Sequence, residues 1–414
     1  MDKSSESVRD WSSLPGEILS LILDCLNDTI TDCLRLRGVC PSWRSSLSPI
    51  ILPDLQFPFE EVLPLLAWIA GPLFDAWTMV SIKQSTFYLI SSPNKENSTT
   101  SVWLTRVEET LRTNLPNIGK VQNPIWCDDD VKMLELKATV NLLDYRIFEV
   151  AMSIRHSHII DGLMFENKMV MLPFRKSRAT GTADNFFLFS LIIGNLTVFK
   201  FEAVGTFLFS RFVVGNYTDI IAYEGKFYAT NLTGRLVSID PMTLTLEMGQ
   251  VVEVIGSQWE EACNECSYMV ISCGRLYLVN KVRNTRKKGN RFELKVFVLG
   301  NLISSNGKLH YFWDPVTTLG DQVFFVSNFE SFSLSAQEIG WGRGNCIFFT
   351  NNEYGSSESR RQRKKKRSES ANSNMYKYFC GLYSLEDGRF FTINSLPAEY
   401  TNIFWPVPSW LSQN

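Results

Sequence analysis

The residues that could carry chemistry in this sequence are few, and they do not form a recognised metal or redox site. Cys263 and Cys266 have the spacing of zinc ligands or of a redox pair. A structural zinc site needs four ligands, however, and the chain offers no second such pair and only three histidines. His156 and His158 alternate, so a strand would place both on one face, without a third ligand nearby. We therefore predict neither a bound metal nor a cofactor.

Clustered acids and a glycine-rich segment do not indicate an enzyme either. The acidic stretches 128–130 and 260–261 lack a matched base or a positioned nucleophile, so we interpret them as solvated turns. The segment Gly340–Gly344 lacks the further glycine and the strand-to-helix setting of a dinucleotide site. No set of nucleophile, base and orienting residue can be named. The sequence therefore predicts a protein without catalytic activity of its own.

A run of basic residues stands out in the last quarter of the chain. Seven of its eight consecutive positions are basic: Arg360, Arg361, Arg363, Lys364, Lys365, Lys366 and Arg367. Mutual repulsion and low hydrophobicity predict an exposed, disordered loop. The run is a candidate nuclear-import signal; a phosphate-binding patch and a solvated insertion are the alternatives. A second basic loop lies at 283–291, but neither loop has the interleaved aromatic residues of a nucleic-acid site.

The first fifty residues contain a compact pattern of helices. Apolar residues at 14, 18, 19, 22 and 26 recur at intervals of three and four, which places them along one side of a helix. Pro15 suits the first turn of that helix, because its missing N–H would have no intrahelical partner. A second helix is expected from about Thr31, and a short third one holds Trp43 and Leu47. So small a block cannot build a sizeable core alone, so we expect it to dock on another polypeptide.

This stretch resembles the F-box motif, which has Leu-Pro followed by an acidic residue and paired aliphatics, then Val-Cys and Trp-Arg. The resemblance covers roughly Asp10 to Pro49. It implies a substrate receptor that joins a cullin-based ubiquitin ligase through a Skp-type adaptor. The residues expected to bind the adaptor are Leu14, Pro15, Ile18, Leu19, Ile22, Leu26, Val39, Cys40, Trp43 and Arg44. Trp43 is expected to matter most, because buried aromatic anchors dominate many interfaces.

Composition is that of a globular protein with a full core. The chain has 414 residues, of which 45% are hydrophobic, and a formal net charge of -2, which gives no global attraction to nucleic acid or anionic membrane. Its nine cysteines are scattered and odd in number, as in proteins that keep reduced thiols. No run reaches the roughly 18 apolar residues of a membrane span. We expect a location in the nucleus, the cytoplasm or both.

From about Ile82 the helical period gives way to short β-branched and aromatic runs separated by turn residues. The clearest hairpins have turns at Gly225 and Gly274, and looser copies are expected at Asn167, Gly320 and Gly388. A spacing near 50 residues is typical of a kelch-type propeller blade. An irregular β-sandwich is the alternative, and neither blade number nor oligomeric state can be read from the sequence.

Details of this region also resemble the plant F-box proteins with a C-terminal kelch-like domain, of the type found among Skp-interacting partners. The resemblance rests on segments 225–229, 319–321, 344–350 and 405–410. It implies a small all-α F-box followed by a mostly β domain, which is expected to be a kelch-like β-propeller. The expected organisation is a disordered N-terminus (1–9), the F-box (10–50), a proline-containing linker (51–80) and a propeller-like target-binding domain (81–414) with a disordered basic insertion near 353–375. A propeller scaffold outside any ligase is the alternative function.

Overall fold

The computed structural model describes the helical block and most of the β domain. The described residues are 11–25, 36, 38–47, 80–91, 102–111, 120–122, 145–160, 163–175, 185–192, 195–201, 207–212, 217–232, 234–241, 246–247, 253–254, 264–283, 292–303, 309–352 and 378–404. The predictions for residues 1–9, the linker before Val80 and the insertion at 353–375 lie outside them. Within the described residues, no helix is long and apolar enough to cross a membrane.

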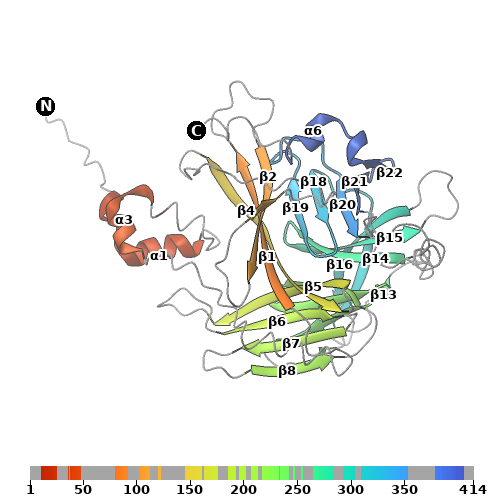
Figure 1. Ribbon diagram of the computed structural model, residues 1–414, viewed down its shortest axis with the longest axis horizontal. Helices are drawn as coiled ribbons and strands as arrows, with labels where there is room; N and C mark the ends of the chain where they lie inside the picture. Colours follow the sequence, from red (N-terminus) through yellow and green to blue (C-terminus); the bar gives the residue numbers. More distant parts are fainter. Residues whose placement is uncertain are drawn as a thin grey trace.

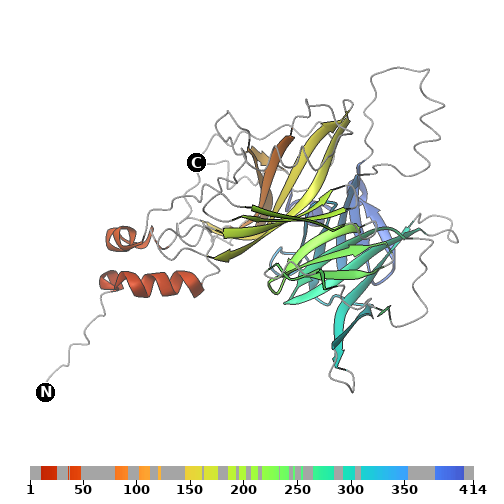
Figure 2. The ribbon, with the colours of Figure 1, turned by 90° about the horizontal axis from the view of Figure 1, so that it is seen from below.

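The N-terminal block contains three short helical elements. These are η1 (Trp11–Ser13), α1 (Gly16–Cys25) and α3 (Pro41–Ser46). Helix α1 begins directly after Pro15, whose carbonyl accepts the backbone N–H of Ile18 and of Leu19 at 3.1 and 3.2 Å. The expected second helix is described only at Leu36, Gly38 and Val39, which are helical. Helices α1 and α3 lie side by side (Figure 2).

The rest of the described chain is almost entirely β and forms four sheets, which can be followed in Figure 1. Sheet 1 contains β1 (Val80–Ser91), β2 (Val102–Leu111), β3 (Lys120–Gln122), β4 (Arg146–Ile160), β5 (Leu163–Arg175), β6 (Asn185–Ile192), β7 (Asn195–Phe201) and β8 (Phe207–Phe212). Sheet 2 contains β9 (Tyr217–Tyr223), β10 (Lys226–Asn231), β11 (Leu236–Ile239) and β12 (Leu246–Glu247).

Sheets 3 and 4 have five strands each. Sheet 3 contains β13 (Glu253–Val254), β14 (Asn264–Ser272), β15 (Arg275–Arg283), β16 (Phe292–Ile303) and β17 (Leu309–Val316). Sheet 4 contains β18 (Gln322–Val326), β19 (Ser331–Ser335), β20 (Cys346–Asn352), β21 (Tyr378–Ser384) and β22 (Arg389–Thr392). A short helical end follows, η3 (Ile393–Ser395) and α6 (Ala398–Thr401).

The four sheets close into a ring. Strand β5 of sheet 1 lies beside β9, β9 beside β14, β14 beside β19, and β19 beside β4 of sheet 1 again. The edge strands β9, β14 and β19 therefore stand at the centre, with the other strands of their sheets further out. Sheet 1 contributes two halves, β3-β2-β1-β4 and β5-β6-β7-β8, joined by the pairing of β4 with β5. This is the arrangement of a β-propeller, in which blades bury their faces against their neighbours.

Each of the four seams between sheets has its own apolar core. The seams are filled by Phe189 and Phe227 between sheets 1 and 2, Leu278 and Tyr228 between sheets 2 and 3, Phe292 and Phe349 between sheets 3 and 4, and Phe87 and Phe325 between sheets 4 and 1. All of these side chains are buried. Aromatic rings bury large areas and pack edge-on or offset, which suits a fold whose blades meet face to face.

The hairpins predicted at Gly225 and Gly274 are confirmed. Each joins a central strand to the next strand outward, β9 to β10 and β14 to β15. Both turns have two residues with positive φ, 48° and 74° at Glu224 and Gly225 and 48° and 70° at Cys273 and Gly274. That is the two-residue turn whose twist matches paired strands. The turn at Gly388 likewise joins β21 to β22.

The turn predicted at Asn167 is wrong. Asn167 lies inside β5, where it pairs with His156 of β4, because the β4–β5 pairing continues through this stretch. Gly320, with φ 61°, does form a turn, but that turn leads from sheet 3 into β18 of sheet 4 instead of closing a hairpin. Polar residues such as Glu166 and Asn167 can therefore lie inside a long strand, and interpreting them as a turn adds a hairpin that the sheet does not contain.

The C-terminal part of the described chain fastens sheet 4 to sheet 1. The backbone N–H of Leu104 on β2 donates to the carbonyl of Ile403 at 2.7 Å. Ile403 and Phe404 are buried in the same apolar core as Leu104 and the sheet 4 residue Phe348. The ends of the β domain are thus held together directly.

Candidate functional site

The helical block is held together by a small core of its own. Leu19, Leu36 and Leu47 are buried, and Leu14, Ile22 and Trp43 pack against them. These side chains come from α1 and the residue two before it, from the stretch before α3, and from α3 and its C-cap. Within the part of the block that the structure describes, three buried side chains make a minimal core, as expected for so short a segment.

Trp43 and Cys40 stabilise the shape of this block. The Trp43 indole N–H donates to the carbonyl of Trp11 at 2.8 Å, which ties η1 to α3. Cys40 is the N-cap of α3, and its Sγ accepts the backbone N–H of Trp43 at 3.4 Å. Pro41 follows in the first turn, where a missing N–H costs nothing. Trp43 and Cys40 are both half-buried, so both have an internal structural role.

Four large apolar side chains of the block remain exposed, and we call them the docking set. They are Trp11, Ile18, Leu21 and Val39, whose exposed fractions are 65%, 42%, 58% and 58%. Ile18 and Leu21 are three residues apart on α1, and Ile18 is also four residues before Ile22, so the exposed side chains lie next to the packed ones on the helix. Among the apolar side chains of α1 that the structure describes, Leu19 and Ile22 pack in the block's own core, whereas Ile18 and Leu21 are exposed beside them.

The predicted adaptor-binding residues divide into three groups. Pro15, Ile18, Val39 and Arg44 are exposed, and Leu14, Ile22, Cys40 and Trp43 are half-buried. Leu19 is fully buried in the block's own core. Leu26 lies outside the described residues.

Sequence reasoning missed Trp11 and Leu21. Both lay within the range assigned to the F-box, but the interval pattern selected one side of the helix only. The sequence does contain a signal for Leu21, because positions 21 to 23 are all apolar. Three consecutive apolar residues extend beyond one face of a helix, whereas an amphipathic helix with a single buried face has apolar residues only at intervals of three and four.

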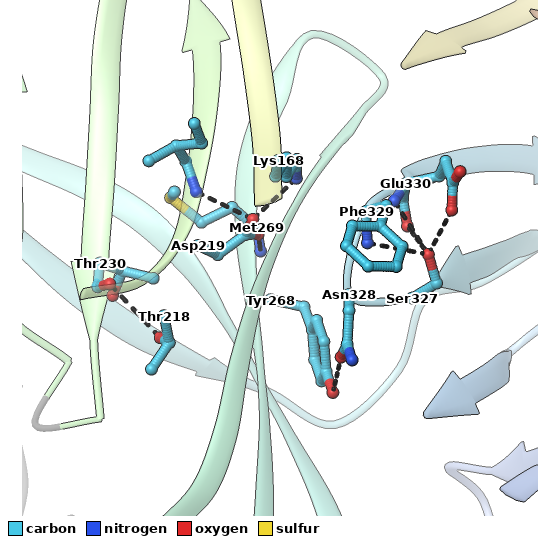
Figure 3. A network of polar contacts seen from close by, with 11 residues as sticks. Lys168, Thr218, Asp219, Thr230, Tyr268, Met269, Ser327, Asn328, Phe329 and Glu330 are labelled. Atoms are coloured by element: carbon cyan, nitrogen blue, oxygen red, sulfur yellow. Dashed lines mark hydrogen bonds and ion pairs between the residues drawn. The ribbon is translucent and has the colours of Figure 1, made fainter. Parts of the chain in front are cut away.

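A second notable site lies at the centre of the propeller, where buried polar groups connect the sheets (Figure 3). Lys168 Nζ on β5 lies 2.7 Å from Asp219 Oδ1 on β9. The other oxygen of Asp219 accepts the backbone N–H of Met269 on β14 at 2.6 Å. One carboxylate therefore joins sheets 1, 2 and 3. Burial raises the pKa of Asp219, and the Lys168 ammonium opposes that shift.

Polar contacts also cross the remaining two seams. Tyr268 on β14 donates its hydroxyl to Asn328 Oδ1 at 3.2 Å, which joins sheets 3 and 4. Glu330, at the start of β19, accepts the Ser153 hydroxyl at 3.2 Å and lies 3.7 Å from an Arg155 nitrogen, which joins sheet 4 to sheet 1. Arg155 also pairs with Glu108 of β2.

We call these contacts the central polar ring: Ser153, Arg155, Lys168, Asp219, Tyr268, Met269, Asn328 and Glu330. Arg155 and Lys168 are cross-strand neighbours, and two like charges placed opposite each other are unfavourable. Carboxylates from sheets 2 and 4 offset that repulsion, so the ring stabilises closure of the propeller. Sequence reasoning missed the ring, because the partners that meet across each seam are 50 or more residues apart in sequence.

The other residues considered for chemistry are only partly described. His156 and His158 lie on β4, and Cys266, on β14, forms no disulfide. Across the described part of the chain, no group of three or more His, Cys, Asp or Glu side chains could hold a metal ion. Cys263, the acidic stretches at 128–130 and 260–261, and the basic run at 360–367 lie outside the described residues.

Comparison with known proteins agrees with this architecture. The family model of the KIB1-4 β-propeller matches residues 206–379. The F-box protein SKIP23 of Arabidopsis thaliana is 24% identical over 430 aligned positions, which cover 98% of this chain and 96% of that protein. An F-box/kelch-repeat protein of the same plant is 25% identical over 357 positions, covering 83% of this chain and 84% of its own length.

The alignment with SKIP23 extends over the helical block as well as the propeller, because it covers nearly the whole of both chains. The comparisons confirm the resemblance of this protein to the plant F-box proteins that carry a C-terminal β-propeller.

Proposed function

We propose that this protein is the target-recognition subunit of a Skp–cullin–F-box ubiquitin ligase. The helical block docks on a Skp-type adaptor, and the propeller holds a target protein beside the ubiquitin-charged enzyme. The chain then supplies proximity, which raises the local concentration of a target lysine near the ubiquitin thioester. The bond-making chemistry belongs to other subunits, so no catalytic residue is required here.

The observation that carries this proposal is the exposed docking set. Trp11, Ile18, Leu21 and Val39 present large apolar surfaces on a small block, in the described part of which three apolar side chains are buried. Exposed apolar groups that gather on one small element mark interaction sites in soluble proteins. The names of the aligned relatives, which are F-box proteins, support an adaptor as the partner.

A binding experiment with paired variants tests the proposal. The double variant Ile18→Asp with Leu21→Asp places charge on the exposed side of α1, and Ser20→Asp is the matched control at an exposed position of the same helix. Desolvating a charge at an apolar contact is costly, so we expect the double variant to bind a purified Skp-type adaptor at least about tenfold more weakly. Calorimetry with the full-length chain measures both affinities. Unchanged binding by the double variant would refute adaptor docking through this surface.

The alternative function is a propeller scaffold that works outside any ligase. Affinity purification of the full chain with the proteasome inhibited separates the two. The ligase subunit recovers a cullin together with target proteins, and the double variant loses the cullin but keeps the targets. A scaffold keeps its protein partners and recovers no cullin with either form.

We also propose that the basic run at 360–367 directs nuclear import, which the composition of that run supports. Replacement of its seven basic residues by alanine is expected to shift a fluorescently tagged protein from the nucleus to the cytoplasm. The matched control replaces the basic residues of the 283–291 loop. An unchanged nuclear signal in the first variant would remove this proposal.

A further inference from the structure

A pocket lies in the seam between sheets 4 and 1, next to the central polar ring. The pocket is partly enclosed and partly open to solvent. Its lining residues are Phe87, Phe325, Val326, Ser327, Glu330, Phe332, Phe348, Thr350 and Phe404. Ser327 and Thr350 are half-buried while the other lining residues are buried, so these two mark the open side.

Five aromatic rings form most of the pocket wall. Phe325 packs against Phe332, Phe348 and Phe404 with ring centroids 4.9, 5.9 and 6.3 Å apart. Phe87 packs against Phe332 at 5.1 Å. The faces of such rings carry negative electrostatic potential and attract cations as well as apolar groups. The wall therefore suits an apolar chain that ends in a positive charge.

The polar part of the wall is a carboxylate that is already fixed in place. Ser327 donates its hydroxyl to Glu330 Oε2 at 2.6 Å, and Ser153 donates to Oε1 at 3.2 Å (Figure 3 shows Ser327 and Glu330). A carboxylate can accept about four hydrogen bonds, so these two leave acceptor capacity. Arg155, 3.7 Å from Oε1, also pairs with Glu108, so its charge is shared between two carboxylates.

We propose that this pocket, the seam pocket, binds a primary alkylammonium group on a short apolar chain. The Glu330 carboxylate accepts from the ammonium, the phenylalanine rings cover the methylene groups, and an anion is excluded by Glu330. In the cell, the source of this group is a lysine side chain of the recognised target, a step that rests on the proposed function. The binding chemistry itself does not depend on the adaptor.

Ligand-observed saturation-transfer NMR on the full-length protein tests the binding chemistry. The probes are n-butylamine, n-butanol and butyrate at equal concentration, which share an apolar chain and differ in charge. We expect the strongest saturation transfer to the amine, weaker transfer to the alcohol and none to butyrate. Equal transfer to amine and alcohol would overturn the role of Glu330, and no transfer to any probe would overturn the pocket as a binding site.

Matched variants locate the binding. Thr350→Trp fills the open side of the pocket, and Thr317→Trp adds the same ring at an exposed position elsewhere. The first variant is expected to lose at least about fivefold in amine affinity, and the second to match the wild type. Glu330→Gln is expected to remove the preference for amine over alcohol. Thermal unfolding midpoints confirm that each variant is folded, and unchanged amine binding by Thr350→Trp contradicts the proposal.

The two proposals can fail separately. Adaptor binding is measured with the docking-set variants, and amine binding with the seam-pocket variants, in the same full-length chain. Loss of amine binding with normal adaptor affinity would remove the seam pocket alone. Normal amine binding without adaptor affinity would leave the pocket and remove its assignment to a ligase target.

Discussion

Two tryptophans, one in the helical block and one in the propeller, have opposite surroundings. Trp11 of the block is 65% exposed, whereas Trp313 of the propeller is fully buried and donates its indole N–H to the carbonyl of Gly234 at 2.9 Å. The propeller packs most of its described apolar residues in four seams between its own sheets, although Phe148 and Met152 of β4 are exposed, whereas the much smaller block leaves the four residues of the docking set exposed. A fold that closes on itself can serve as a stable support, and apolar surface that stays exposed on a small segment is available to a partner.

The largest expected effect is the loss of Trp313. Trp313→Ala removes a fully buried ring and leaves a cavity in the seam between sheets 2 and 3, and it also removes the donor to Gly234. We expect the free energy of unfolding to fall by about 3–5 kcal/mol. Urea denaturation followed by circular dichroism measures the change. A fall below about 1 kcal/mol would contradict the view that this seam is tightly packed.

The next effect comes from the central polar ring. Lys168→Met removes the ammonium that faces Asp219 and leaves a buried carboxylate, which is expected to cost about 3 kcal/mol of stability. The double variant Lys168→Met with Asp219→Asn is expected to lose less than the sum of its single variants, because it leaves no unpaired charge. Urea denaturation of all four proteins completes the cycle. Additive losses would show that the ion pair does not couple sheets 1 and 2.

Alkaline pH should weaken the propeller by a somewhat smaller amount. Burial raises the pKa of Cys346 from 9.0 to about 12 and that of Tyr383 from 10.0 to about 12. The unfolded chain therefore releases these protons first, and stability falls as the pH rises from about 9 toward 12. We expect a loss of roughly 2–3 kcal/mol between pH 8 and pH 10.5 from the two groups. Tyr383→Phe should make the fall shallower, and an equal fall in both proteins would argue against this cause.

The smallest expected effect on stability is that of Trp11→Ala. Its side chain is largely exposed, and its one described hydrogen bond uses the backbone carbonyl, which alanine keeps. The unfolding free energy should change by no more than about 0.5 kcal/mol. If the docking set acts as proposed, the same variant weakens adaptor binding. A large loss of stability would instead place Trp11 in the block's core and remove the contrast with Trp313.

Local features of the fold could be predicted from the sequence. The start of α1 after Pro15, the α3 helix around Trp43 and the hairpin turns at Gly225, Gly274 and Gly388 all depend on neighbouring residues. Such turns need positive φ, which glycine adopts without strain, so the sequence reports them directly. The spacing of about 50 residues between the hairpins at Gly225 and Gly274 likewise indicates a propeller, although the turns expected at Asn167 and Gly320 do not close hairpins.

Features that depend on distant pairing could not be predicted in this way. Asn167 has the composition of a turn, yet its pairing with His156 keeps it within β5, and the two halves of sheet 1 join there. The central polar ring requires Lys168, Asp219 and Met269 to meet from three sheets, and no local pattern marks them. Likewise, Ile18 is exposed and Leu19 is fully buried, although both residues fit the same helical period in the sequence.

The hydrogen bond between Leu104 and Ile403 bears on how the chain can fold during its synthesis. About 300 residues separate these two positions, so sheet 1 and sheet 4 cannot be joined until almost the entire β domain has left the ribosome. Until then the apolar face of β1 and β2 that later meets Phe348 and Phe404 has no partner from sheet 4. A nascent chain of this protein should therefore depend on chaperones for longer than a chain whose first blade is complete at once.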